Sequence, residues 1–96
     1  MAVLCAGFIG AFALDDAYCA GRIVALLDGE RSDAAIAAEL VAQSFPNALA
    51  GLQARTYGPP GLEEDIKWCA HESVLDAVPR LERMVDGAAE IVRVEL

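Results

Sequence analysis

Two adjacent carboxylates are the residues of this chain whose types and spacing could do chemistry. Asp15 and Asp16 follow a stretch from Met1 to Leu14 that contains no charged side chain. Mg²⁺ prefers hard oxygen ligands, typically one or two carboxylates together with water and phosphate. Such an ion neutralises the charge that phosphoryl transfer places on the non-bridging oxygens. The pair is therefore a candidate both for the metal ligands and for the catalytic residues of a phosphoryl-transfer site.

The same pair has a simpler interpretation as a helix cap. The apolar spacing after Asp15 is helical, and Asp is among the preferred N-cap residues, where it stabilises a helix by about 1 kcal/mol. The dipeptide alone favours capping over metal binding, and Asp15 could cap while only Asp16 binds.

Several groups near the pair could bind an anion. Gly7 lies in a glycine-punctuated loop, and the first turn of the helix would present the free amides of Ala17 and Tyr18. The arginines 22, 31 and 55 could each reach a phosphate or sulfonate, or could simply balance the acidic excess as surface charges. We assign Gly7 and Arg22 to substrate binding. No GxGxxG or Walker pattern is present.

The cysteines indicate in which cellular compartment the protein lies and do not indicate a catalytic role. Cys5, Cys19 and Cys69 form an odd set without a CxxC spacing, which favours reduced thiols in a cytoplasmic protein. A cysteine nucleophile of a phosphatase needs a phosphate-binding loop with an arginine, and the CAGR stretch is not one. We therefore expect Cys19 and Cys69 to be buried core thiols.

The candidate site residues must be positioned by helices and strands, and the sequence predicts a mixed α/β fold. Residues 2–6 (AVLCA) are typical of a buried strand closed by a glycine. Helices are expected from Asp15, over 33–44 with Ser32 as cap, over 48–56 with Asn47 as cap, and over 63–71. Residues 74–81 should be extended at a sheet edge because of Pro79, and an Asp-Gly turn at 86–87 precedes a final strand over 90–96. Short strands and about four helices indicate one layered α/β half-domain spanning 1–96.

Composition excludes some partners and suggests others. The net charge of −8 argues against binding to nucleic acid or to an anionic membrane surface. The apolar fraction of 56% is high for a chain of 96 residues, so some apolar surface should pack against another chain.

Five pieces of the sequence follow one another in a fixed order: CAG at Cys5–Gly7, FALDDAYCAG at Phe12–Gly21, SDAAIAA at Ser32–Ala38, EEDIKWCA at Glu63–Ala70 and AVPRL at Ala77–Leu81. Together they resemble the C-terminal half of the 2-phosphosulfolactate phosphatase family. The second piece is the most specific, and the match covers most of the chain.

The resemblance implies a Mg²⁺-dependent phosphatase that releases sulfolactate and phosphate from a small anionic phosphate ester, on a route to coenzyme M. It places Asp15 and Asp16 at the family's acidic pair, and Asp65 and Cys69 at its later acidic-cysteine helix.

Two departures from the family pattern suggest a partner. Family chains are longer, and the segment ARTYGPPGLEED looks shortened, with Tyr57 near the place of a family histidine. We therefore expect activity to require a homo-oligomer or a partner chain that supplies the missing half. The alternative is a non-catalytic binding or assembly module that retains the fold.

Overall fold

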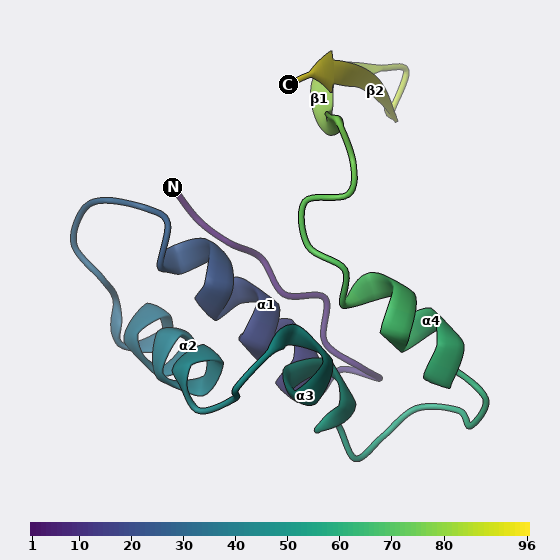
Figure 1. Cartoon of the computed structure of the whole chain (residues 1–96). Coiled ribbons are helices and arrows are strands. Elements are labelled where there is room, and N and C mark those ends of the chain that lie inside the picture. Colours follow the sequence, from purple (N-terminus) through teal and green to yellow (C-terminus); the bar gives the residue numbers. More distant parts are fainter.

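The computed structural model describes all 96 residues as a set of helices followed by a hairpin. Four helices come first and two strands last (Figure 1). The expected mixed α/β class is confirmed. The elements are α1 Leu14–Val24, α2 Asp33–Gln43, α3 Ala48–Gln53, α4 Glu63–Cys69, β1 Ala77–Val85 and β2 Ala88–Glu95.

The core lies where α1 meets α2 and α3, and small residues make it possible. A Cβ on Gly21 of α1 would lie 2.0 Å from the carbonyl oxygen of Ala38 in α2, so only glycine lets the two backbones approach so closely. A Cβ on Gly51 of α3 would lie 2.5 Å from the ring of Tyr18. Tyr18 is 3% exposed and packs edge-on against Phe45. The Ala- and Gly-rich sequence thus produces close helix contacts instead of a large apolar core.

Side-chain caps set the N-termini of α2 and α3 as the sequence predicts, although α3 ends at Gln53, short of the expected 48–56. The Oγ of Ser32 accepts a hydrogen bond from the Ala35 N–H at 3.2 Å, and the Oδ1 of Asn47 accepts one from the Ala50 N–H at 2.9 Å. At the C-terminal end of α1, the Arg31 guanidinium donates to the carbonyl oxygens of Val24 and Leu27 at 3.0 and 2.8 Å. These contacts satisfy backbone groups that a helix end leaves unpaired.

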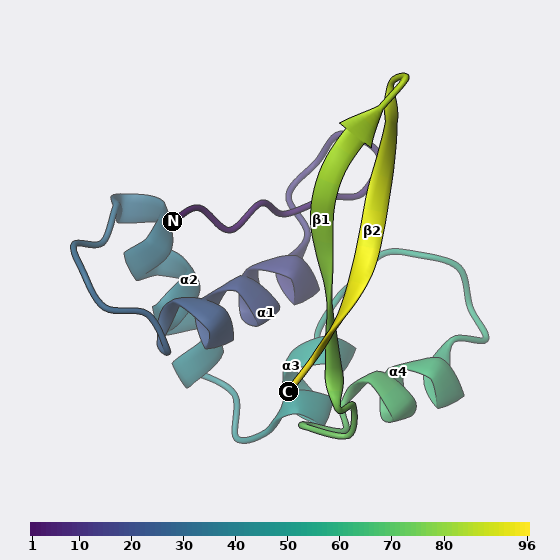
Figure 2. The ribbon, with the colours of Figure 1, turned by 90° about the horizontal axis from the view of Figure 1, so that it is seen from above.

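The hairpin forms from the predicted turn. Asp86 and Gly87 have φ values of 50° and 80°, the left-handed pair that a two-residue type I′ turn requires. β1 pairs with β2 in antiparallel register, with an irregularity between Leu81 and Arg83. Pro79 is tolerated because every strand of a two-stranded sheet is an edge strand. The hairpin projects away from the helices (Figure 2).

The predicted strand over residues 2–6 is wrong. These residues run alongside α1 without regular structure, and their backbone groups take part in no hydrogen bond (Figure 1). An apolar run forms a strand only when a neighbouring strand pairs with it, and β1 and β2 pair with each other instead.

Burial is sparse across the molecule. Only 8 of the 96 residues are buried, and all of them lie between Ala13 and Gly51. Large apolar side chains such as Leu75, Leu81 and Ile91 are more than half exposed on and beside the hairpin. None of the helices combines the length and apolar character that crossing a membrane would need.

Candidate active site

One pocket brings together residues from four separate segments of the chain. It lies between the start of α1, the loop after α3, the first turns of α4 and the N-terminal loop at Gly7. The polar and ionisable residues that line it are Asp15, Asp16, Cys19, Arg55, Tyr57, Asp65 and Cys69. The acidic pair and the acidic-cysteine helix, far apart in sequence, therefore share one site.

The acidic pair does not cap α1. The N-cap position is Ala13, which has no side chain that could accept a hydrogen bond, so both aspartates belong to the first helical turn. The capping interpretation of Asp15 is therefore wrong. Negative charge in this turn is still favourable, because the helix dipole is positive there.

The N-terminal loop fixes the orientation of Asp16. The Gly7 N–H donates to Asp16 Oδ2 at 2.7 Å. Gly7 has a φ of 72°, and a Cβ at this position would lie 2.7 Å from the Ala11 carbonyl oxygen, so the turn needs glycine. Gly7 lines the pocket, but its amide is engaged by Asp16. Its assignment to substrate binding stays a prediction.

Tyr57 fixes the orientation of Asp15. The Tyr57 hydroxyl donates to Asp15 Oδ1, which also accepts the Asp16 N–H at 3.0 Å. The Phe8 ring stacks on the Tyr57 ring with centroids 4.9 Å apart. Desolvation, followed by the hydrogen bond to Asp15, raises the pKa of Tyr57 to about 12, so the phenol stays protonated and keeps donating. The sequence marks Tyr57 only as lying near the place of a family histidine, because its contact with Asp15 depends on the fold.

The thiols are not buried, which corrects the expectation of core cysteines. Cys5, Cys19 and Cys69 are free and exposed, because the helices pack through alanine and glycine and leave the cysteine positions outside the core. The Cys19 thiol lines the pocket. Partial desolvation there, and secondarily the charges of Asp15 and Asp16, raise its pKa above the ordinary value. A raised pKa disfavours the thiolate and thus a nucleophilic role.

Arg22 lies away from this pocket. It is in the last turn of α1, and its Nη1 forms an ion pair with Glu72 at 2.6 Å and donates to the Tyr18 hydroxyl at 2.9 Å. The hydrogen bonds to Glu72 and Tyr18 raise the pKa of Arg22 further. The structure thus does not bring Arg22 together with the acidic pair, and its assignment to substrate binding stays a prediction.

A family model described as 2-phosphosulpholactate phosphatase matches residues 1–84. The chain belongs to the 2-phosphosulfolactate phosphatase family. Its acidic pair and its acidic-cysteine helix both fall within the matched residues.

Curated relatives carry the same family name. The 2-phosphosulfolactate phosphatase of Methanothermobacter thermautotrophicus is 33% identical over 94 residues, which cover 94% of this chain and 40% of the relative. The probable 2-phosphosulfolactate phosphatases of Thermus thermophilus and Gloeobacter violaceus are each 35% identical, over 92% and 81% of this chain and 40% and 35% of theirs. The chain thus spans 35–40% of the length of these relatives.

The acidic-cysteine helix α4 forms one wall of the pocket. Asp65 and Cys69 are one helical turn apart on α4, so both face the same side. Asp65 does not extend the acidic pair into a larger ligand set, because no group of three or more His, Cys, Asp or Glu side chains is placed to hold a metal ion.

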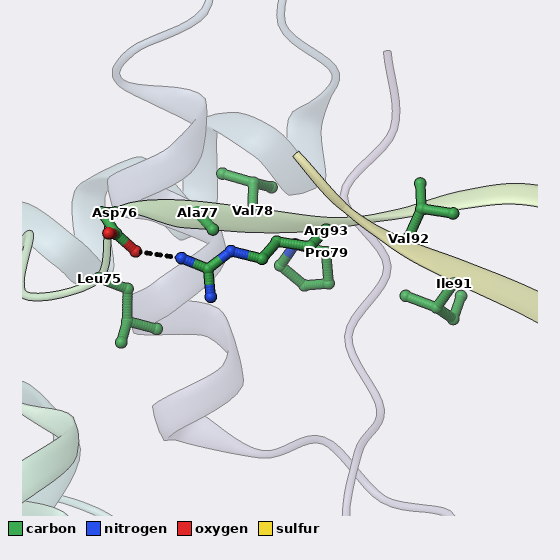
Figure 3. A pocket seen from close by; sticks show the side chains of 8 residues that line it. All are labelled: Leu75, Asp76, Ala77, Val78, Pro79, Ile91, Val92 and Arg93. Carbon is green, nitrogen blue, oxygen red and sulfur yellow. Dashed lines mark hydrogen bonds and ion pairs between the residues drawn. The ribbon is translucent and has the colours of Figure 1, made fainter. Parts of the chain in front are cut away.

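A second pocket, on the hairpin, offers no comparable chemistry. Its lining is mostly apolar, and its two charged residues, Asp76 and Arg93, pair with each other at 2.6 Å (Figure 3). The acidic pair is therefore the stronger candidate for the functional site of this family member.

Proposed function

We propose that this chain forms the carboxylate-bearing part of a cytoplasmic, Mg²⁺-dependent phosphatase. Its substrate is a small anionic phosphate ester of the 2-phosphosulfolactate type, and its products are sulfolactate and phosphate. One observation carries the proposal: in a member of this family, Asp15 and Asp16 share a pocket and are held there by contacts from distant parts of the chain.

The acidic pair suits Mg²⁺. Asp15 Oδ1 and Asp16 Oδ2 accept the protein hydrogen bonds, while Asp15 Oδ2 and Asp16 Oδ1 accept none. Each side chain thus combines one anchored oxygen with one oxygen available to a cation, and carboxylate oxygens are the donors that Mg²⁺ prefers. Asp15 and Asp16 would hold the ion, which supplies positive charge to the phosphate oxygens when bound.

The surrounding residues would keep the carboxylates in place. The Gly7 amide fixes Asp16, and the Tyr57 hydroxyl fixes Asp15, with Phe8 stacked behind the phenol ring. Holding groups that act on one ligand in a fixed geometry lowers the barrier, because less ordering remains to be done in the transition state.

We further propose that the active species is an assembly. A site open to solvent on a chain with 8 buried residues would gain both rigidity and water exclusion from a covering surface. The exposed apolar side chains of the hairpin would supply much of that contact. A second copy or a separate polypeptide would then complete the site.

The test is phosphate release from 2-phosphosulfolactate and from phenyl phosphate, measured with and without Mg²⁺ over a range of protein concentrations. Light scattering on the same samples gives the state of association. We expect Mg²⁺-dependent turnover that rises with association and falls about 100-fold in Asp16→Asn, as for the loss of a group that places charge at the reacting atoms. Asp33→Asn, an exposed carboxylate in the first turn of α2, is the control.

A non-catalytic assembly module is the second candidate, favoured by the sparse burial of the isolated chain. It predicts association without Mg²⁺-dependent turnover at any concentration, which would contradict a phosphatase whose site is completed by a second copy of this chain. A monomer with full activity would instead contradict the need for an assembly.

A further inference from the structure

We propose that Arg55 binds a second oxyanion group of the substrate, the carboxylate or sulfonate that lies away from the ester phosphate. This inference rests on the proposed function of the same pocket. It assigns the anionic end of the ligand to a residue on the loop after α3, which lines the same pocket as the acidic pair on α1.

Arg55 is the one lysine or arginine of the chain without an acidic partner. The chain has seven Lys and Arg residues, and the other six form ion pairs. Arg55 forms none within 4.0 Å, although Asp15, Asp16 and Asp65 line the same pocket. In a protein with a net charge of −8, its positive charge is therefore available to a ligand.

The loop holds the guanidinium in place. Arg55 Nη1 donates to the Tyr57 carbonyl oxygen at 2.5 Å, and the guanidinium carbon lies 6.0 Å from the centroid of the Tyr57 ring. Gly58 has a φ of 97°, and a Cβ there would lie 2.1 Å from Arg55 Nη1. Glycine at this position thus serves both the left-handed backbone and the space that the guanidinium occupies.

Tyr57 separates the two ends of the site. Its backbone carbonyl accepts from Arg55, whereas its hydroxyl, at the far end of the side chain, donates to Asp15. The guanidinium would therefore contact one part of a ligand, and a cation held by the carboxylates would contact another part. A small molecule with a phosphate at one end and another oxyanion at the other matches this arrangement.

The donor geometry suits an oxyanion. A guanidinium carries five N–H donors in a planar fork, and one nitrogen of Arg55 is engaged by the Tyr57 carbonyl. The remaining donors can bind a carboxylate or sulfonate through two parallel hydrogen bonds, which a lysine cannot reproduce. The same charge offsets the repulsion between an anionic ligand and the three carboxylates of the pocket.

The test compares two ligands by titration calorimetry of the whole chain. Phosphoglycolate carries a phosphate and a carboxylate, and inorganic phosphate carries no second acid group. We expect Arg55→Met to weaken phosphoglycolate binding about tenfold or more, the loss typical of a charge-assisted hydrogen bond, and to change phosphate binding in Mg²⁺ by less than about threefold. Arg55→Lys should restore part of the loss. Arg83→Met, on the hairpin, removes the same charge elsewhere.

Two outcomes would overturn the inference. One is an Arg55→Met affinity for phosphoglycolate equal to that of Arg83→Met. The other is an equal weakening of both ligands, which would mean that Arg55 binds the phosphate itself. Both ligands are titrated in Mg²⁺ and again without it, so a failure of the metal proposal, seen as no effect of Mg²⁺ on phosphate binding, stays distinguishable. Circular dichroism confirms that each variant folds.

Discussion

The helices α1–α3 and the β1–β2 hairpin hold their shape by different means. Every buried residue lies in or beside the first three helices, where glycine and alanine allow close backbone contact. The hairpin has no buried residue, and is held by its ladder, its turn and ion pairs such as Arg83–Glu90 at 2.6 Å. Since exposed ion pairs contribute little, the hairpin of an isolated chain should be far less stable than the helices.

The difference explains where the site lies. Asp15 and Asp16 extend from α1, the most buried helix, and the residues that orient them come from loops packed against it. The hairpin offers apolar surface without site residues. One region therefore holds the acidic pair in a fixed position, while the other exposes apolar surface.

We expect Gly21→Val to have the largest effect on stability, because it introduces a side chain where the backbones of α1 and α2 are closest. The new side chain would begin 2.0 Å from the Ala38 carbonyl, a backbone atom that cannot move aside. We expect a loss of about 3 kcal/mol or more in unfolding free energy, measured by urea denaturation. Ala37→Val, exposed on α2, should cost less than about 1 kcal/mol. Similar losses in both variants would contradict the α1–α2 packing.

Gly87→Val tests the independence of the hairpin. Gly87 has a φ of 80°, which a β-branched residue adopts only with strain of about 1–3 kcal/mol. We expect faster amide hydrogen exchange in β1 and β2 and unchanged exchange in α1 and α2. Equal loss of protection in the helices would show that the two regions fold as one unit.

Tyr57→Phe tests whether the hydrogen bond from Tyr57 to Asp15 stabilises the helical region. The pKa of Tyr57 is raised to about 12, above the value of about 10 for an unfolded tyrosine. The stability that the neutral phenol contributes is therefore complete below pH about 10 and is lost as the pH rises from about 10 to about 12. We expect Tyr57→Phe to cost about 1 kcal/mol at pH 8 and to remove this alkaline decline. Thermal melts from pH 8 to 11.5 measure both, and an unchanged pH profile in the variant would count against the Asp15 contact.

Local chemistry was predictable from the sequence. Ser32 and Asn47 cap their helices and Asp86-Gly87 forms its turn, because each depends only on residues within a few positions. The acidic pair was also recognisable, since its adjacent charges interrupt an apolar stretch.

Long-range contacts were not predictable. Tyr57 and Asp15 are 42 positions apart, and no local pattern pairs them. Which arginine remains free depends on tertiary ion pairs, so Arg22 and Arg55 look alike in the sequence although only Arg22 has an acidic partner. The apolar run at residues 2–6 has strand composition, but the folded chain offers it no pairing strand.

The most direct measurement of the central claim is the Mg²⁺ dependence of the melting temperature in the wild-type chain, Asp16→Asn and Asp33→Asn. Binding to the native state stabilises it by about 1.4 kcal/mol at ten times the dissociation constant. If Asp15 and Asp16 hold the ion, millimolar Mg²⁺ with phosphate raises the melting temperature of the wild type and of Asp33→Asn but not of Asp16→Asn. Equal shifts in all three proteins, or no shift in the wild type, would contradict the metal site at the acidic pair.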